Sequence, residues 1–361
     1  MRTLTLHVGT HKTGSTSLQA FLLQNKARLA DRGYDYPTEG CYCWPRSGHS
    51  PLAHALAGTR PAWLDPARVI PGRVECVQAI RRRIEQVGAP HVLISTEHFF
   101  THVPPQVLRQ TFDGLGYHLR VLVFLRPQDE FLESRYAQSV KVGRCQQSFE
   151  SFVQEQLADR TSYGHYLPPL RRLAAAFGPM NLLLRTFRSQ QPRTRLFSRF
   201  LEAVGLDLDD DFILPEARNA SLPAELTRTL AALQAQIEGE QVRRASLNRW
   251  LLEANRPPAF PDSETRLLSP EAAQRIMACF EEQNAEIARS FLGRKELFAP
   301  SGRSTWPVAA PPTLEQLADA AIHLWFGMHQ EQQQLREQLR RLRAPRTNDG
   351  PVLENNGDPG D

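Results

Sequence analysis

Residues 7–17, HVGTHKTGSTS, have the composition and spacing of a phosphate-binding loop. In the form G-x-x-x-x-G-K-[ST], a lysine directly after the second glycine reaches the β- and γ-phosphates of a nucleotide. Gly9 and Gly14 keep that spacing, but Ser15 stands where the lysine belongs and Lys12 lies inside the loop. We expect such a loop to hold an anion with its positive charge above the cradle, beside an oxygen that bridges two acidic groups.

Several groups in this segment can bind that anion. Backbone amides between Gly9 and Thr16, together with the N-terminus of the helix that follows, form an anion cradle. Ser15, Thr16 and Ser17 add hydroxyl donors. The chain has four lysines, and arginine fills nearly every other basic position. The lysine at position 12 is therefore a specific feature of the loop.

A second candidate for phosphate binding is Arg126, which ends the apolar run 119–125. Ser134 follows it in the predicted helix 128–143. An arginine at the carboxyl end of a strand and a serine in the next helix can give a charge-assisted pair and a hydroxyl hydrogen bond to a terminal phosphate. A magnesium site of the P-loop type needs a carboxylate at such a strand end. The apolar run ends in arginine and not in aspartate, and an arginine at a strand end taken alone is more often part of a salt bridge.

The elements around these residues alternate between buried strands and amphipathic helices. Apolar segments predict four strands, at 4–8, 91–95, 119–125 and 180–187. The runs at 91–95 and 119–125 are typical of parallel strands covered on both faces. Helical periodicity predicts helices at 15–33, 73–88, 128–143 and 194–205, and a short one at 51–58 within the otherwise irregular region 34–72. The alternation predicts an α/β fold, a three-layer P-loop-like domain with a parallel sheet flanked by helices, whose ligands bind at the carboxyl ends of the strands.

The second half of the chain is predicted to be mainly helical, with helices at 223–255 and 269–293. We expect a main domain, a linker, a long C-terminal helix and a disordered tail, at 1–299, 300–312, 313–343 and 344–361 respectively. The long helix becomes polar along its length. It is a candidate for self-association or for binding a partner.

Composition limits the classes of function. A chain of 361 residues, 41% of them hydrophobic, can bury a full core, and a net charge of +4 does not indicate a nucleic-acid surface. The five cysteines are scattered, and Cys41 with Cys43 near His49 form only a weak metal motif. No apolar run approaches the ~20 residues of a membrane span, and a signal peptide is not evident. The sequence predicts a cytoplasmic protein with no transmembrane segment and no nucleic-acid partner.

Two segments together resemble a known family. HVGTHKTGSTSLQ resembles the 5′-phosphosulfate loop of sulfotransferases that use 3′-phosphoadenosine 5′-phosphosulfate (PAPS), in particular the bacterial carbohydrate-type enzymes. VLVFLRPQDEFLESRYAQSVKVG, residues 121–143, resembles the 3′-phosphate segment of that family. The similarity continues through SGHSPLAHALAG, LISTEHF, RNASL and EEQNAEIARSFLG, and spans residues 3–299.

The resemblance implies that the chain transfers a sulfuryl group from PAPS to a hydroxyl or amine of an acceptor, a carbohydrate or glycolipid, and that no metal is required. Lys12 is then the residue that stabilises the leaving phosphate as negative charge develops on it. The implied donor site has two parts: His11, Lys12, Thr13, Gly14, Ser15 and Thr16 around the 5′-phosphosulfate, and Arg126 with Ser134 around the ribose phosphate.

The base that takes the acceptor's proton has two candidates. His49 lies in the irregular region where related sulfotransferases carry a catalytic glutamate, and the ordinary pKa of histidine, ~6.5, suits a base near neutral pH. Glu97, beside His98, follows the second predicted strand, where other members of the family place a catalytic or sulfate-contacting side chain. A late glycine-rich segment that closes over the nucleotide in animal cytosolic sulfotransferases has no match here, so the adenine-binding residues stay unassigned.

Two other functions fit parts of the sequence. A P-loop kinase uses ATP and magnesium, but the displaced lysine and the strand that ends in arginine disfavour it. A nucleotide-binding module that acts through its C-terminal helix binds its ligand without turnover. Its phenotype survives Lys12→Ala and is lost on deletion of residues 305–361, which separates it from an enzyme.

Overall fold

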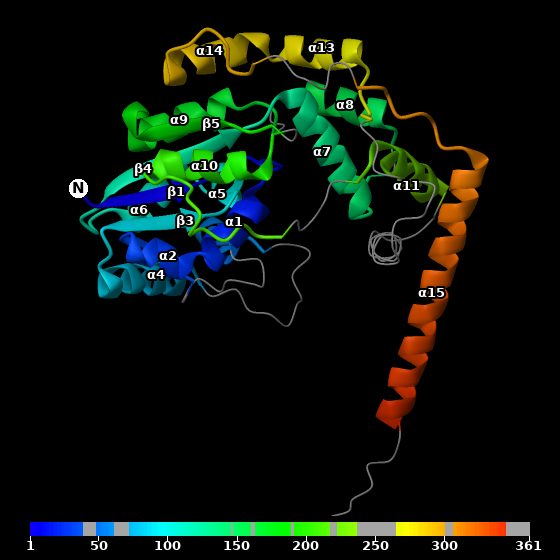
Figure 1. The fold of residues 1–361 in the computed structure, drawn as a ribbon, viewed down its shortest axis with the longest axis horizontal. Coiled ribbons are helices and arrows are strands. Elements are labelled where there is room, and N and C mark those ends of the chain that lie inside the picture. Colours follow the sequence, from blue (N-terminus) through cyan, green and yellow to red (C-terminus); the bar gives the residue numbers. More distant parts are fainter. Residues whose placement is uncertain are drawn as a thin grey trace, which may run out of the picture.

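The computed structural model describes most of the chain, namely residues 1–38, 48–60, 72–145, 147–159, 163–188, 191–216, 222–236, 265–299 and 306–343. Its centre is a five-stranded parallel sheet with the strand order β2-β3-β1-β4-β5 (Figure 1). The strands are β1 (Thr3–His7), β2 (Tyr34–Asp35), β3 (His91–Ser95), β4 (His118–Leu125) and β5 (Leu182–Thr186). The predicted α/β class and its parallel sheet are confirmed.

The register of the sheet brings several carboxyl ends to one edge. His7, the last residue of β1, lies opposite Ser95 of β3 and Leu122 of β4. Every residue of β1 is buried, because helices cover both faces of the sheet. The segments that follow β1, β3 and β4 therefore emerge side by side, which is where a ligand of such a fold binds.

Helices form the outer two layers. On one face, Leu93, Leu122 and Phe124 pack against a cluster built by three helices, α1 (Ser15–Gln24), α2 (Lys26–Asp31) and α10 (Arg193–Val204). The other face is covered by α3 (Ser50–Ala57), α4 (Arg73–Val87), α5 (His98–His102), α6 (Pro105–Phe112), α9 (Leu167–Phe177) and α14 (Glu281–Leu292). A single turn of 3-10 helix, η1 (Pro179–Asn181), leads into β5.

The helix expected at 15–33 is two helices, α1 and α2, divided at Asn25. The amide nitrogen of Asn25 donates to the carbonyl oxygens of Phe21 and Ile213, and its Oδ1 atom accepts from the backbone of Ile213. The helix is therefore interrupted at Asn25, whose side chain binds a segment 188 residues away in sequence. Likewise, the helix expected at 269–293 is divided at Phe280 into α13 (Pro270–Cys279) and α14.

A second cluster lies beyond the sheet and joins α7 (Gln128–Lys141), α8 (Phe149–Ala158), α11 (Ala224–Gln236) and α13. Arg266, which is almost fully buried, ties this region to α7. Its Nη2 atom lies 3.2 Å from Asp129 and 3.1 Å from Glu133. Glu133 also accepts from the backbone amides of Leu267 and Leu268. These bonds satisfy a buried ion group that would otherwise be costly.

The C-terminal helix α15 (Leu314–Arg343) extends away from the rest of the molecule (Figure 1). The predicted helix at 223–255 begins as α11, but residues 237–264 lie outside the described residues, as does the predicted disordered tail. Within the described segments, none of the helices combines the length and the apolar character needed to cross a bilayer.

Candidate functional site

The predicted phosphate loop connects β1 to α1 and is held against β4. The backbone amides of Val8 and Thr10 donate to the carbonyl oxygens of Leu122 and Phe124, and the hydroxyl of Thr10 donates to Phe124 as well. Thr13 closes the loop internally, since its hydroxyl donates to the carbonyl of Thr10 at 2.6 Å. The strand, loop and helix arrangement is the one that the sequence predicts.

Close packing explains both glycines of the loop. A Cβ atom at Gly9 would lie 3.0 Å from Oγ of Ser15, and one at Gly14 would lie 2.6 Å from Cδ2 of Leu196. Gly14 also has a φ of +81°, a left-handed value that glycine adopts at little cost. Glycine at both positions therefore lets the loop pass close to Ser15 and Leu196.

Lys12 has an unfavourable backbone conformation and an ammonium group whose charge is disfavoured. Its φ is +65°, the one left-handed non-glycine backbone in the described part of the chain, and its Nζ atom donates to Oε1 of Gln138 at 3.1 Å. The pKa of Lys12 is lowered to about 8, first by burial and then by the charges of Arg126 and Lys141. An anion placed among these cations would favour the charged form of Lys12.

Arg126 lies directly behind the loop. Its Nη1 atom donates to the carbonyl oxygen of Lys12 at 2.9 Å, and its Nε atom lies 3.5 Å from Oε2 of Glu130. Tyr166 donates to the carbonyl of Arg126 itself. Arg126 therefore fixes the strained backbone of Lys12 as well as bringing positive charge to the site. Ser134, the other predicted ligand of the ribose phosphate, lies partly exposed on α7.

The first turn of α1 contains an unsatisfied hydroxyl. Oγ of Ser15 is buried and has no hydrogen-bond partner among the described residues. Buried polar groups are nearly always paired in native proteins, and an orphan indicates a missing water, ion or ligand. Thr16, the next residue, is partly exposed at the same helix N-terminus. These donors fit an anionic group that lies on the loop.

Glu97 faces the cationic loop from the end of β3. It is the N-cap of α5, and its Oε2 atom accepts from Nε2 of Gln19 at 3.2 Å. Its negative charge acts on Lys12 in the direction that raises the lysine pKa. The side chain is partly exposed, so it can meet a ligand.

His49 does not have the exposure that a base requires. It is fully buried, Nε2 lies 2.7 Å from the carbonyl of Pro37, and the backbone amide of Ser95 donates to Nδ1 at 3.2 Å. Burial lowers the pKa of His49 to about 4. Nδ1 thus joins the start of α3 to Ser95 at the end of β3, and Nε2 joins it to Pro37, in the segment after β2. This burial favours Glu97 over His49 as the candidate base.

Four histidines that the sequence did not bring together meet beside Glu97. The ring of His98 contacts those of His11, His54 and His102, with centroid separations of 5.6, 4.8 and 5.2 Å. His11 also meets Tyr163, over which Arg135 stacks. The pKa of His11 is lowered to about 3, by burial first and by His98 next. These rings form a wall of imidazole groups on one side of the loop.

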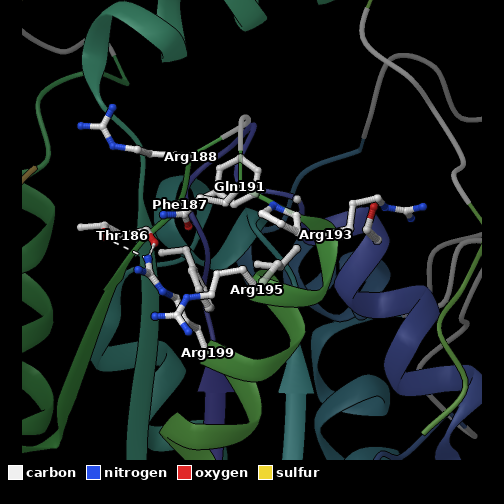
Figure 2. Close-up of a pocket in the computed structure, with 12 residues that line it drawn as sticks. Thr186, Phe187, Arg188, Gln191, Arg193, Arg195 and Arg199 are labelled. Atoms are coloured by element: carbon white, nitrogen blue, oxygen red, sulfur yellow. Dashed lines mark hydrogen bonds between the residues drawn. The ribbon is translucent and has the colours of Figure 1, made fainter. Parts of the chain in front are cut away.

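A pocket rich in arginine lies on the opposite side of Gly14 (Figure 2). Its walls come from the end of β5 and from α10, and its basic side chains are Arg188, Arg193, Arg195 and Arg199. Figure 2 shows Arg195 and Arg199 side by side, while Arg188 and Arg193 extend outward. Burial, followed by the charge of Arg195, lowers the pKa of Arg199. Crowded cations of this kind favour an anionic ligand.

The pocket is continuous with Arg126. Phe187 lines the pocket and lies under the Arg126 guanidinium, 5.7 Å from its ring centroid. Glu130 accepts contacts from both Arg126 and Arg188. The sequence signal for this pocket is the dense run of arginines between 185 and 199. Its members converge because α10 packs beside α1, which sequence spacing does not reveal.

No group of histidine, cysteine, aspartate or glutamate side chains in the described part of the chain is arranged to hold a metal ion. Cys41 and Cys43, the two cysteines of the weak metal motif, lie outside the described residues. The carboxylates nearest to Arg126 are engaged with arginines, as Glu130 and Glu133 show.

Comparisons with known proteins give distant similarities. No protein-family model matches the chain. An uncharacterized protein from Archaeoglobus fulgidus is 26% identical over 189 residues, which are 50% of this chain and 48% of that protein. The chain thus spans about half the length of this curated relative. The crystal structure of a sulfotransferase from Alicyclobacillus acidocaldarius is similar with a TM-score of 0.37 and 15% identity, covering 68% of this chain and 95% of that one.

Proposed function

We propose that the protein is a sulfotransferase that moves a sulfuryl group from PAPS to a hydroxyl or amine of an acceptor. One observation carries the proposal: Lys12 lies inside the loop, among Arg126, Arg135 and Lys141, above the N-terminus of α1. A lysine after the second glycine serves a terminal nucleotide phosphate. In the sulfotransferase loop that residues 7–19 resemble, the lysine at this inner position serves the oxygen that bridges the phosphate and the sulfuryl group.

The loop residues have separate tasks in this proposal. Backbone amides from Gly9 to Thr16 and the unsatisfied hydroxyl of Ser15 hold the 5′-phosphosulfate, with His11 and Thr13 shaping the loop. Lys12 stabilises the charge that develops on the leaving phosphate as the sulfur–oxygen bond breaks. Its depressed pKa reflects a site prepared for negative charge, and arrival of that charge keeps the ammonium protonated.

Glu97 is our proposed base. Its carboxylate is partly exposed at the carboxyl edge of the sheet and faces the same cations as the ligand. It can take the proton of the attacking hydroxyl as the new sulfur–oxygen bond forms. His49 supports Glu97 indirectly, because its Nδ1 atom accepts from the backbone amide of Ser95 at the end of β3, two residues before Glu97.

The ribose phosphate is assigned to Arg126, Ser134 and the arginine pocket beside Gly14. Arg126 and the pocket share the wall formed by Phe187, and Arg195 and Arg199 supply further charge. A bound phosphate offsets the repulsion among these guanidinium groups. The proposed acceptor class, a carbohydrate or glycolipid, rests on the family that the loop and residues 121–143 resemble.

Calorimetric titration tests the donor. We expect the purified protein to bind 3′,5′-bisphosphoadenosine, the product of the proposed reaction, with an affinity that magnesium does not change. ADP, which lacks the ribose phosphate, is expected to bind more weakly under both conditions. Preference for ADP in the presence of magnesium would replace this proposal with an ATP-dependent kinase.

The two candidate bases are separated by paired substitutions. Glu97→Gln is expected to slow transfer by ~10²–10⁴-fold with little change in the urea midpoint, since it removes a proton acceptor at a partly exposed position. His49→Gln is expected to lower the urea midpoint, because a fully buried ring with two backbone contacts is lost. Normal transfer by Glu97→Gln would remove Glu97 from the mechanism.

A further inference from the structure

The helix α15 is far longer than its contact with the rest of the chain. It has 30 residues, which gives a length of about 45 Å at the usual helical rise. Ala320 is fully buried in the cluster shared with α11, and Leu317 is partly buried near it. Beyond these first turns the helix extends away from the body (Figure 1). Isolated helices are marginal in water, so packing elsewhere is expected to stabilise it.

The sequence of α15 has a coiled-coil repeat. Apolar residues alternate at spacings of four and three over positions 314, 318, 321, 325, 328, 332, 335, 339 and 342. The exception is Gln332, and a single polar residue in such a seam commonly fixes register. We call these nine positions the α15 seam.

The α15 seam faces away from the protein's own core. Leu314, Trp325 and Leu335 are 84%, 60% and 52% exposed. Ala318 and Ala321 are exposed as well, whereas Ala320 on the other side of the helix is buried against α11. Every seam side chain that the structure describes is therefore open to solvent.

We propose that the α15 seam pairs with that of a second copy of this chain in an antiparallel coiled coil. Charge along the helix supports self-pairing in this orientation. The first half, 314–328, contains Glu315 and Asp319 and neither lysine nor arginine. The second half, 329–343, contains four arginines against two glutamates. Antiparallel pairing places each acidic half beside a basic half, whereas parallel pairing places like beside like.

Side-chain size supports the same orientation. The antiparallel register matches Leu314 with the partner's Leu339, Ala318 with the partner's Leu335 and Trp325 with the partner's Met328. In this register Ala318 meets the larger Leu335, and Trp325 meets the flexible Met328 in place of a second tryptophan. A parallel register would instead match Trp325 with the partner's Trp325 and Ala318 with the partner's Ala318, which overfills one layer and leaves a gap in another.

The pairing is tested on the full chain by light scattering after size exclusion. We expect a dimer for the unchanged protein, and a monomer with unchanged helical circular dichroism for Trp325→Glu and for Leu335→Glu. Gln330→Glu, at an exposed position on the outer face of the same helix, adds the same charge and is expected to remain a dimer. A monomeric unchanged protein at ~50 µM, or dimers of both seam variants, would overturn the proposal.

Cysteine cross-linking tests the orientation. In the antiparallel pair, Ala318→Cys with Leu335→Cys is expected to form a covalent dimer on mild oxidation. Each single variant is expected to match the unchanged protein, because two copies of one position lie about 25 Å apart along the seam. Cross-linking by Ala318→Cys alone would show parallel pairing and overturn the proposed orientation.

Discussion

Replacement of Lys12 by methionine should make the protein more stable while it abolishes transfer. The pKa of Lys12 falls from an ordinary 10.5 to about 8, so the folded state disfavours its charge. At ~1.4 kcal/mol for each pKa unit, that difference corresponds to about 3 kcal/mol at neutral pH. Loss of the hydrogen bond to Gln138 destabilises the variant by about 1 kcal/mol and reduces this gain. Because the side chain is partly exposed, solvent screens part of the charge penalty, and the expected net gain in unfolding free energy is about 1–2 kcal/mol.

The pH dependence of stability shows whether the extra stability of Lys12→Met comes from removing the buried charge. Lys12 is charged in both the folded and unfolded states below pH 8, so the folded state carries the full penalty there. Between pH 8 and 10.5 the unfolded chain binds more protons than the folded one, and the stability of the unchanged protein rises with pH. The advantage of Lys12→Met should therefore be largest at pH 7 and mostly gone at pH 10.

Urea unfolding at these two pH values measures the effect, with Lys295→Met as the matched control. Lys295 is exposed and distant from the loop in sequence, so its replacement should change neither stability nor transfer. If Lys12→Met were less stable than the unchanged protein at pH 7, the inferred free-energy penalty on the charge of Lys12 would be refuted. If it transferred sulfate normally, the proposed role in the reaction would be refuted.

Two further substitutions test the loop and its support. Gly14→Ala places a methyl group 2.6 Å from Leu196 at a left-handed backbone, so it should lower the unfolding free energy by about 2–4 kcal/mol. Gly58→Ala is the matched control, because its φ is also left-handed but no atom lies near, and it should cost about 1 kcal/mol. Equal thermal shifts for the two variants would contradict the packing argument. Glu133→Gln leaves the buried Arg266 with Asp129 as its remaining ion partner among the described side chains. It should lower the unfolding free energy, measured in urea, by about 3–5 kcal/mol. A change within experimental error would show that the ion group of Arg266, Asp129 and Glu133 contributes little to stability.

The central strands and the loop could be predicted because their signals are local. Residues 92–94 of β3 and 121–125 of β4 are continuous apolar runs, and the glycine spacing of the loop follows directly on β1. The edge strand β2 has only two residues, too short for a pattern to show. The break at Asn25 depends on Ile213, far away in sequence, so helical periodicity alone extends through it.

Site residues divide in the same way. Lys12 and Glu97 follow strands whose positions are predictable, and the sheet brings them to one edge. His49 has suitable chemistry for a base, but its burial is set by Pro37 and Ser95, which contact both of its ring nitrogens. Residue type indicates what a side chain can do, whereas tertiary packing decides whether a ligand can reach it.

The positive charges around the loop connect stability with the proposed function. Burial, followed by the charges of Arg126 and Lys141, disfavours the charge of Lys12, although Glu97 opposes the effect. A fold selected for stability alone would place an apolar residue at such a position. An anion on the α1 N-terminus reverses the sign, because it lowers the energy of the charged lysine and satisfies the hydroxyl of Ser15. The same interaction then becomes strongest when negative charge builds on the leaving phosphate, which is the condition for accelerating a reaction and not only for binding its substrate.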